Sequence, residues 1–210
     1  MTRFFADFDC EWLGECEYQR ATQYMHQVWE QVSQGLSSGK ILGFTPTHET
    51  IALGKHCSLK EELRMSVDDL QQSGVEVVET QRGGKATVHY PGQLVIYPVL
   101  PVNRLGYGCK KFVEVLAEQM LTLLRELGIE AYYDTTYPGV WIGLEKVCAI
   151  GVSVRRRVSA YGLALNIAQP SPAFRLIYPC GIQDRGVTYV NRWLTHATQP
   201  EAYWTRLTAP

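Results

Sequence analysis

The sequence has no long apolar segment. No run of about 18 apolar residues occurs in its 210 positions, so we expect no helix that crosses a membrane. The first residues, MTRFFADFDCEWLG, include acids and lack the basic-then-apolar order of a signal peptide. A net charge of −1 gives no reason to expect nucleic acid as a partner. These absences predict a cytoplasmic protein that binds neither a membrane nor nucleic acid.

Motifs for metals and phosphates are also scarce. The cysteines contain no CxxC pair and stand alone at Cys10, Cys16, Cys57, Cys109, Cys148 and Cys180. Without an export signal, they are expected to be free thiols and not disulfides. His56 and Cys57 are adjacent, a spacing that chelates zinc poorly. No GxxxxGK[ST] loop occurs, and we therefore expect neither a metal nor a bound cofactor.

The pattern of apolar residues predicts one α+β domain over residues 1–210. Apolar residues recur at helical spacing in 16–36 and 110–127. Thr198 and Glu201 have capping-box spacing, with Pro200 in the first turn of a short last helix. The strand-like segments are 40–44, 49–54, 75–80, 94–100, 129–134, 139–143, 146–156 and 159–167. They outnumber the helices without alternating strictly with them, which favours a mixed, mostly antiparallel sheet with packed helices.

A glycine pair in RGGKATVH is the first candidate site. Gly83 and Gly84 would let backbone N–H groups approach a ligand closely, and Arg82, Lys85 and His89 bracket them. An ordinary hairpin loop with a solvated charged face has the same pattern. The segment by itself leaves both interpretations open.

A lysine enters an apolar strand in KVCAIG. Strand alternation predicts Lys146, Cys148 and Ile150 on one face, opposite Val147 and Ala149. Such a lysine either extends along the sheet edge into water or is held in a pocket for its amine. Of these two outcomes, the edge position is the more common one.

Two further segments contain small residues next to reactive or apolar ones. Residues 161–166 could line a narrow apolar slot or form a tightly packed central strand. Cys180 stands between Pro179 and Gly181, which favour a sharp turn that could present the thiol. A lone cysteine is more often an inert small hydrophobic residue.

Taken in order, RGGKATVHYPGQL, GVWIGLEKVCAIGV, YGLALNI and YPCGI resemble the motifs of the lipoyl(octanoyl) transferase family, also called lipoate-protein ligase B. The resemblance covers about residues 40–190. It implies a domain of the biotin and lipoate protein ligase type, with a tunnel for an eight-carbon chain. It also implies that an octanoyl or lipoyl group passes from acyl carrier protein to an enzyme cysteine. From there the group would pass to a lysine of a lipoyl domain, in 2-oxoacid dehydrogenases or the glycine cleavage H protein.

The same resemblance implies the roles of individual residues. Cys180 matches the acyl-thioester nucleophile and Lys146 its lysine partner. A nearby ammonium favours the thiolate, and a lysine can serve as general base and then acid, which contributes about 10²–10⁴-fold. The implied substrate-binding residues are Arg82, Gly83, Gly84, Lys85, Ala86, Thr87, Val88, His89, Ala149, Ile150, Gly151, Gly162, Leu163 and Ala164.

Three residues depart from the family pattern. Tyr90 stands where the family usually has glycine, so we expect a tighter approach to the preceding loop. Cys148 replaces a common alanine, and alternation predicts a second thiol on the face of Lys146. Tyr161 replaces a frequent histidine. Each is expected to alter chain-length preference or rate without removing the Cys180–Lys146 pair.

Other functions stay open at this level. An ATP-dependent lipoate or biotin ligase shares the implied fold and a lysine near this strand position, but needs no nucleophilic cysteine. A non-catalytic domain that binds acyl carrier protein could keep the scaffold. An amidotransferase would take octanoyl from another protein and use both residues. Replacement of Cys180 by Ser or Ala separates the first case, because a ligase would remain active.

Overall fold

The computed structural model describes residues 4–72, 74–181 and 184–209, apart from the side chains of residues 61, 71 and 180. Its main sheet has the strand order β1-β2-β6-β10-β9-β8-β7, with β11 beside β9. The strands are β1 Cys10–Cys16, β2 Lys40–Pro46, β6 Gln93–Val99, β7 Tyr132–Asp134, β8 Gly139–Ile142, β9 Glu145–Arg155, β10 Val158–Asn166 and β11 Gly186–Val187. The β1–β2 and β11–β9 pairs are parallel and the other pairs are antiparallel. The predicted mixed, mostly antiparallel sheet is confirmed.

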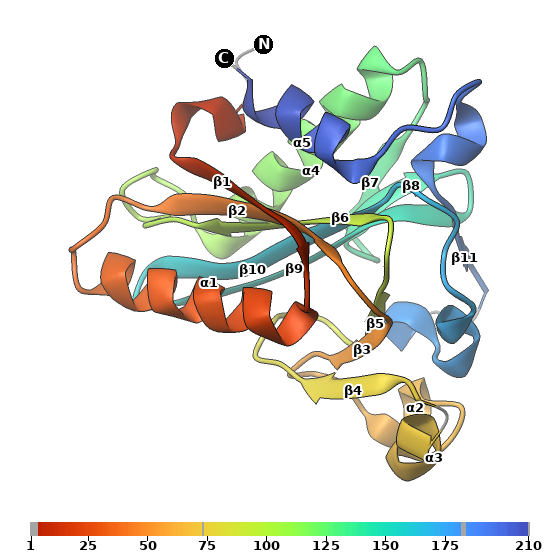
Figure 1. Ribbon diagram of the computed structural model, residues 1–210. Coiled ribbons are helices and arrows are strands. Elements are labelled where there is room, and N and C mark those ends of the chain that lie inside the picture. The colour runs from red at the N-terminus through yellow and green to blue at the C-terminus, as the bar shows by residue number, and fades with distance from the viewer. Residues whose placement is uncertain (1–3, 73, 182–183, 210) are drawn as a thin grey trace.

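Helices cover both faces of this sheet (Figure 1). Helix α1, Tyr18–Ser33, lies on one face, while α4, Cys109–Glu126, and α5, Pro200–Thr208, lie on the other. Each long helix turns an apolar stripe to the sheet, as residues three and four apart share a face. The buried stripe of α1 consists of Tyr18, Ala21, Met25, Val28, Trp29 and Val32. No helix in the described ranges has the length and apolar character to cross a bilayer.

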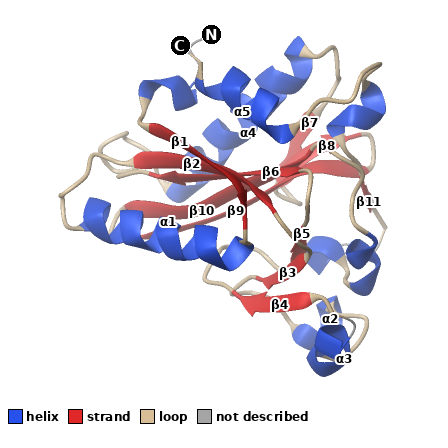
Figure 2. Ribbon diagram, viewed as in Figure 1, coloured by secondary structure: helices blue, strands red, loops and turns tan. Residues whose placement is uncertain are grey.

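A second, smaller sheet with the order β4-β3-β5 lies below the main sheet in Figure 2. It consists of β3 Thr50–Leu53, β4 Glu76–Glu79 and β5 Thr87–His89, with the short helices α2 Leu59–Glu62 and α3 Val67–Gln72. The 3₁₀ helices are η1 Phe4–Asp7, η2 Pro172–Leu176, η3 Pro179–Gly181 and η4 Val190–Trp193. This unit packs its own core, formed by Ile51, Leu53, Leu63, Leu70, Ala86, Val88, Ala173 and Ile177. The core contains residues from both β5 and the segment before η3, so the small sheet links these two parts of the chain.

The predicted helices and strands are present, but the predicted capping box is wrong. Gln199 is the N-cap of α5, and no side chain caps the helix. The backbone of Thr198 is instead bound by Asn191, whose Oδ1 accepts from Thr198 N–H at 3.0 Å and whose Nδ2 donates to Thr198 O at 3.0 Å. Pro200 occupies the first turn, as predicted. The sequence pattern does not predict strands β1, β5 and β11 or the short helices α2 and α3.

Candidate functional site

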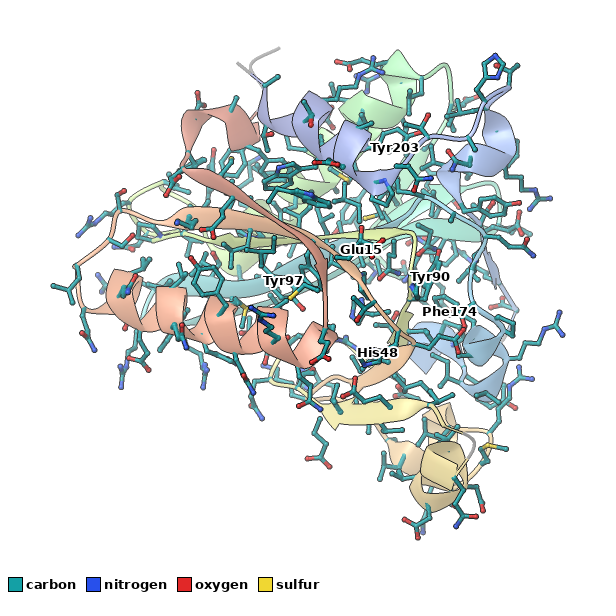
Figure 3. The ribbon with its side chains drawn as sticks, viewed as in Figure 1. Glu15, His48, Tyr90, Tyr97, Phe174 and Tyr203 are labelled. Carbon is teal, nitrogen blue, oxygen red and sulfur yellow. The ribbon has the colours of Figure 1, made fainter. Side chains whose placement is uncertain are left out.

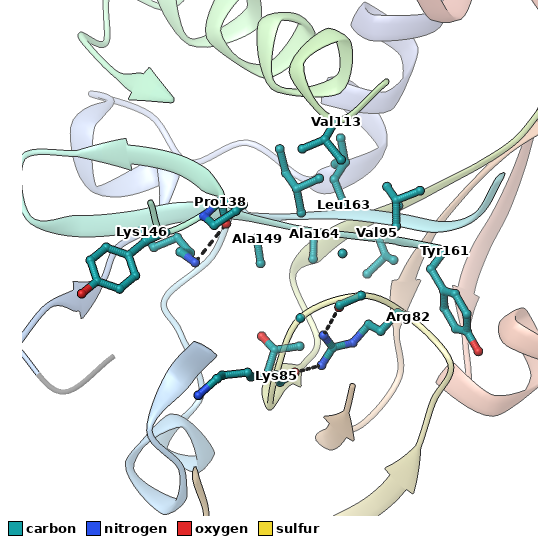
Figure 4. A pocket seen from close by; sticks show the side chains of 18 of the residues that line it. Arg82, Lys85, Val95, Val113, Pro138, Lys146, Ala149, Tyr161, Leu163 and Ala164 are labelled. Atoms are coloured by element: carbon teal, nitrogen blue, oxygen red, sulfur yellow. Dashed lines mark hydrogen bonds between the residues drawn. The ribbon is translucent and has the colours of Figure 1, made fainter. Parts of the chain in front are cut away.

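A cavity of about 640 Å³ runs along β9 and β10, between the loop of residues 82–85 and the turn of residues 135–138 before β8. Figure 4 shows Lys146 at one end of this pocket and Tyr161 at the other, with Val95, Ala149 and Ala164 between them. The pocket is therefore elongated and follows the strands.

Cross-strand pairs of small residues form the floor of the pocket. Ala149 of β9 pairs with Ala164 of β10, and further along Gly151 pairs with Gly162. All four line the pocket, as does Val95 of β6, the partner of Ala164. Paired residues project from the same side of a sheet, and small ones leave room above the backbone. The expected apolar slot lies here.

Lys146 is held inside the pocket and does not extend along the sheet edge. Its side chain is 5% exposed. The ammonium donates to Pro138 O at 3.2 Å and lies 4.9 Å from the centre of the Trp141 ring. Burying a lysine amine costs free energy unless hydrogen-bond partners bind the amine. A buried lysine therefore usually has a function that depends on its amine. Of the two interpretations that the sequence left open, the structure supports the pocket.

The predicted shared face of Lys146 and Cys148 is wrong, because β9 contains a β-bulge. Trp141 pairs with Lys146, whereas the preceding Val140 pairs with Cys148, so Val147 is an extra residue in the ladder. The bulge resets the alternation. Lys146 therefore lines the pocket with Ala149, while Cys148 is fully buried in the main core.

The environment of Cys148 makes its thiol inert. Burial raises the pKa of Cys148 to about 12, although the nearby Lys146 acts in the opposite direction. Burial likewise raises the pKa of Cys10 and Cys57 to about 11, and it also raises the pKa of Cys16. The thiolate is the nucleophilic form of cysteine. None of these thiols is therefore activated.

The backbone of Cys180 lies in η3, and its side chain is outside the described part of the structure. The next residue, Gly181, lines the same pocket as Lys146. A few residues later, β11 pairs in parallel with β9, with Val187 opposite Lys146. Segments that are far apart in the sequence thus meet at one end of the pocket. The role of Cys180 as nucleophile stays a prediction.

Glu62, which no sequence motif indicates, connects the loop of residues 82–85 with the segment before Cys180. Its fully buried carboxylate accepts from Ala86 N–H at 2.7 Å and pairs with Lys85 Nζ at 3.3 Å. Its backbone carbonyl accepts from Tyr178 N–H at 2.8 Å. A Cβ placed on Gly181 would lie 2.6 Å from Lys85 Nζ, so the lysine passes directly over this glycine. One residue thereby holds the glycine loop against the turn that contains Cys180.

Arg185 holds the other side of that turn. Its guanidinium pairs with Asp134 Oδ2 at 2.7 Å and lies 4.8 Å and 4.9 Å from the ring centres of Tyr137 and Trp141. The backbone N–H of Tyr137 and the Arg185 guanidinium lower the pKa of Asp134. The carboxylate form is thus favoured, and the ion pair ties the segment after η3 to the turn before β8.

The first candidate loop is bound from within by Arg82. Its guanidinium donates to Ala52 O at 2.5 Å, to Lys85 O at 2.6 Å and to Gly83 O at 3.1 Å. Gly83 N–H donates to Val152 O at 3.2 Å, which attaches the loop to β9. Burial and the charge of Arg82 lower the pKa of His89 to about 3, so the imidazole is neutral. The loop is therefore a rigid wall of the pocket.

All of the expected lining residues except Ala86 and Val88 line the pocket. These two are fully buried in the core of the small sheet instead. The reason is the alternation of β5, which turns Thr87 and His89 to the pocket and their neighbours away from it. The lining residues that the sequence did not indicate as such are Tyr18, Val95, Tyr97, Lys110, Val113, Tyr133, Thr135, Thr136, Tyr137, Pro138 and Val152.

The departures at Tyr90 and Tyr161 have different outcomes. Tyr90 is not a lining residue: its hydroxyl donates to Ala168 O at 3.0 Å and its ring lies 6.0 Å from that of Phe174 (Figure 3). It packs beside the loop without narrowing the pocket. Tyr161 forms the far end, with a φ of 58° that a bulky residue adopts at a cost of about 1–3 kcal/mol. Its hydroxyl accepts from Gln81 N–H at 3.1 Å.

An apolar pocket with an amine at one end can hold a long chain and act on a carbonyl there. In the described ranges, no three His, Cys, Asp or Glu side chains are grouped so that they could hold a metal ion. The chemistry that the described groups offer is proton transfer at Lys146 and hydrogen bonding around the end of the pocket.

The fold is that of the lipoate and biotin protein ligases. A crystal structure of lipoate-protein ligase A bound with ATP superimposes with a TM-score of 0.71, covering 95% of this chain and 83% of that one at 14% identity. Biotin protein ligase from Aquifex aeolicus, in complex with biotin and ATP, superimposes with a TM-score of 0.58. The superposition covers 95% of this chain and 67% of that one, at 14% identity. Residues 17–209 match the model of the lipoyl protein ligase A/B catalytic domain. The chain belongs to this family.

Closer relatives within the family are octanoyltransferases. The octanoyltransferase of Alkaliphilus metalliredigens is 39% identical over 184 residues, which is 87% of this chain and 83% of that protein. That of Caldicellulosiruptor bescii is 38% identical over 184 residues, 86% of this chain and 79% of that protein. The resemblance read from the four sequence motifs is confirmed.

Proposed function

We propose that the protein is an octanoyltransferase of protein lipoylation. It takes an octanoyl or lipoyl group from acyl carrier protein, holds it as a thioester on Cys180, and passes it to a lysine of a lipoyl domain. The observation that supports this most directly is the elongated pocket, whose apolar floor leads to Lys146 at one end (Figure 4). Gly181, the residue after Cys180, lines the same pocket. Relatives that carry the same activity in their names agree with it.

In the first half-reaction, the Cys180 thiolate attacks the donor's thioester carbonyl. The bond between the carbonyl carbon and the carrier's sulfur breaks, and the carrier thiolate leaves with the electron pair. One thioester replaces another, so the exchange needs no ATP. The ammonium of Lys146 favours the cysteine thiolate before the attack and supplies a proton to the leaving sulfur.

In the second half-reaction, the neutral amine of the acceptor lysine attacks the thioester on Cys180. The carbonyl electrons move to oxygen and return as the carbon–sulfur bond breaks. Lys146, in its neutral form, removes the proton of the attacking amine and delivers it to the cysteine sulfur. An amide and a free thiol result, and the enzyme is ready for the next donor.

The pocket supplies the binding free energy of the chain. Seven carbons beyond the carbonyl contribute about 0.8 kcal/mol each, or about 6 kcal/mol in total, when they leave water for the apolar floor of the pocket. The rows of Ala149 with Ala164 and of Gly151 with Gly162 give the chain room to lie along β9 and β10. Because each carbon contributes little, this binding free energy discriminates only modestly between chains that differ by one carbon.

An ATP-dependent ligase is not favoured. The relatives at 38–39% identity are octanoyltransferases, whereas the ligase crystallised with ATP is 14% identical and shares the fold alone. A non-catalytic carrier-binding domain would gain nothing from an amine buried at the end of an apolar pocket, where it is costly.

The test is the mass of the intact protein after incubation with an octanoyl-carrier thioester. We expect wild type to gain one octanoyl group that neutral hydroxylamine removes, and Cys180→Ala to gain none. Cys148→Ala is the matched control, because that thiol is buried in the core, and should acquire the group like wild type. An adduct that persists in Cys180→Ala would refute the proposed nucleophile.

The acceptor is tested by adding a lipoyl domain to the acylated enzyme. We expect the octanoyl mass to move to one lysine of the lipoyl domain, and the glycine cleavage H protein to serve in the same way. An octanoylated protein that charges the enzyme better than the carrier would indicate the amidotransferase. The cytoplasmic location and the single domain over residues 1–210 stay predictions of the sequence.

A further inference from the structure

Four buried residues form a hydrogen-bonded row that begins at β5 of the small sheet and crosses β6 and β10 of the main sheet. The polar row consists of His89, Gln93, Asn166 and Thr188, all of them buried. Gln93 and Asn166 are paired residues of β6 and β10. Thr188 N–H donates to Lys146 O at 3.0 Å, which connects the row to the strand that carries the pocket lysine.

The direction of every bond in the row is determined by its carbonyl groups. Asn166 Nδ2 donates to Thr188 O at 3.0 Å, which turns Asn166 Oδ1 toward Gln93. Gln93 Nε2 donates to this oxygen at 2.9 Å and to Val88 O at 3.3 Å, which turns Gln93 Oε1 toward His89. A backbone carbonyl can only accept, so neither amide can be reversed without two oxygens facing each other.

The last bond of the row determines the tautomer of His89. Gln93 Oε1 lies 2.8 Å from His89 Nδ1 and is an acceptor, so Nδ1 carries the proton. The ring stacks on Tyr18 with 4.5 Å between the ring centres. Nε2 is then an unprotonated acceptor on a residue that lines the pocket, and it has no hydrogen-bond partner among the described residues.

We propose that Gln93 and Asn166 are positioning residues, which hold His89 as the neutral Nδ1–H tautomer so that Nε2 accepts a hydrogen bond from an N–H of the bound substrate. This rests on the proposed function. An acyl chain has no such donor, so the N–H belongs either to an amide of the donor's thioester arm or to the amine of the acceptor lysine. The two half-reactions separate these sources.

The first experiment reads the tautomer directly and does not require activity. Long-range ¹H–¹⁵N correlation spectra of histidine-labelled protein at pH 7 should show His89 with a protonated Nδ1 and an unprotonated Nε2, assigned by comparison with His89→Gln. Gln93→Met should give a mixture of both tautomers, and Asn166→Leu a smaller change in the same direction. Gln119→Met is the matched control, since Gln119 accepts from Phe4 N–H in another part of the molecule, and should leave the spectrum unchanged.

The second experiment measures each half-reaction in a single turnover. In Gln93→Met, we expect about a tenfold loss in one of them, the size of one hydrogen bond, and little change in the other. A slower rate of thioester formation would assign the N–H to an amide of the donor's thioester arm. A slower rate of transfer to the lipoyl domain would assign it to the amine of the acceptor lysine.

Three outcomes would overturn the inference. They are an Nε2–H tautomer in wild type, an unchanged tautomer in Gln93→Met, and a changed tautomer with both half-reactions unaffected. If wild type forms no adduct at all, the proposed octanoyl transfer fails, while the spectra still decide the role of Gln93 and Asn166.

Discussion

Ala164→Val should shorten the chain that the protein transfers best. Ala164 lies on the pocket floor between Lys146 and Tyr161, and its side chain is buried. Valine adds two methyl groups at this position, so about two methylenes of an octanoyl chain lose their place. At about 0.8 kcal/mol each, this removes about 1.6 kcal/mol, or about a 15-fold loss in kcat/KM for octanoyl.

The assay is kcat/KM for a series of carrier thioesters from four to ten carbons. We expect the optimum to move toward six carbons, with the butanoyl value close to that of wild type, because a short chain does not reach the added methyl groups. Ala160→Val is the matched control: it makes the same change in the same strand, at a buried residue that does not line the pocket. Its kcat/KM profile should keep the optimum of wild type, whatever the change in Tm.

A loss in Ala164→Val that is equal for all chain lengths would refute this reasoning. It would mean that the acyl chain does not lie over the Ala149–Ala164 pair, or that the substitution disturbs the end at Lys146. The Ala160→Val profile distinguishes a general effect of overpacking, which typically costs about 1–3 kcal/mol of stability, from an effect on the pocket.

Three other predictions follow from the site. Lys146→Met should lower kcat by about 10²–10⁴-fold with a much smaller change in KM. Lys146→Arg should have the same low kcat, because a guanidinium does not give up its proton. A Lys146→Arg protein with the kcat of wild type would show that only the charge matters. The pKa of His89 is about 3 in the folded protein against about 6.5 when unfolded, so between these values the unfolded state binds the additional proton and stability falls as the pH falls. From pH 7 to pH 5, the free energy of unfolding should therefore fall by about 2 kcal/mol because of His89. Denaturant titration should show that His89→Gln lacks this part of the fall, and an equal dependence of stability on pH in both proteins would contradict the neutral imidazole. Cys148, with its pKa of about 12 and full burial, should resist iodoacetamide in the native protein and react in denaturant, as peptide mass spectrometry can show; rapid native labelling would contradict its place in the core.

The local sequence pattern was sufficient to predict the long helices, most of the strands and the family. The apolar stripe of residues 110–127 predicts a helix because residues three and four apart share a face, and α4 occupies nearly the same range. The four motifs indicate the family because they occur in order, and the match over residues 17–209 agrees. Lys146 and most of the pocket loop were identified at this level too.

The bulge at Val147 and the buried Glu62 could not be predicted in this way. Alternation assumes an unbroken ladder, and whether a strand contains an extra residue depends on the partner strand, here β8. Glu62 stands in a charged segment that looks solvated, and only the packing of α2 against the small sheet buries its carboxylate beside Lys85 and Ala86. The capping box failed for a similar reason, since Asn191 binds the backbone of Thr198 across the loop.

By itself, the sequence determined the long helices and most of the strands, the motifs that carry chemistry and the family that the chain resembles, because these depend on neighbouring residues and on motif order. Only the tertiary structure decided that Lys146 faces the pocket and Cys148 the core, that Gly181 and Lys146 meet at one end, and that His89 is a neutral acceptor. These properties depend on contacts between residues far apart in the chain, such as Gln93 with Asn166 and Thr188 with Lys146, and no local pattern encodes them.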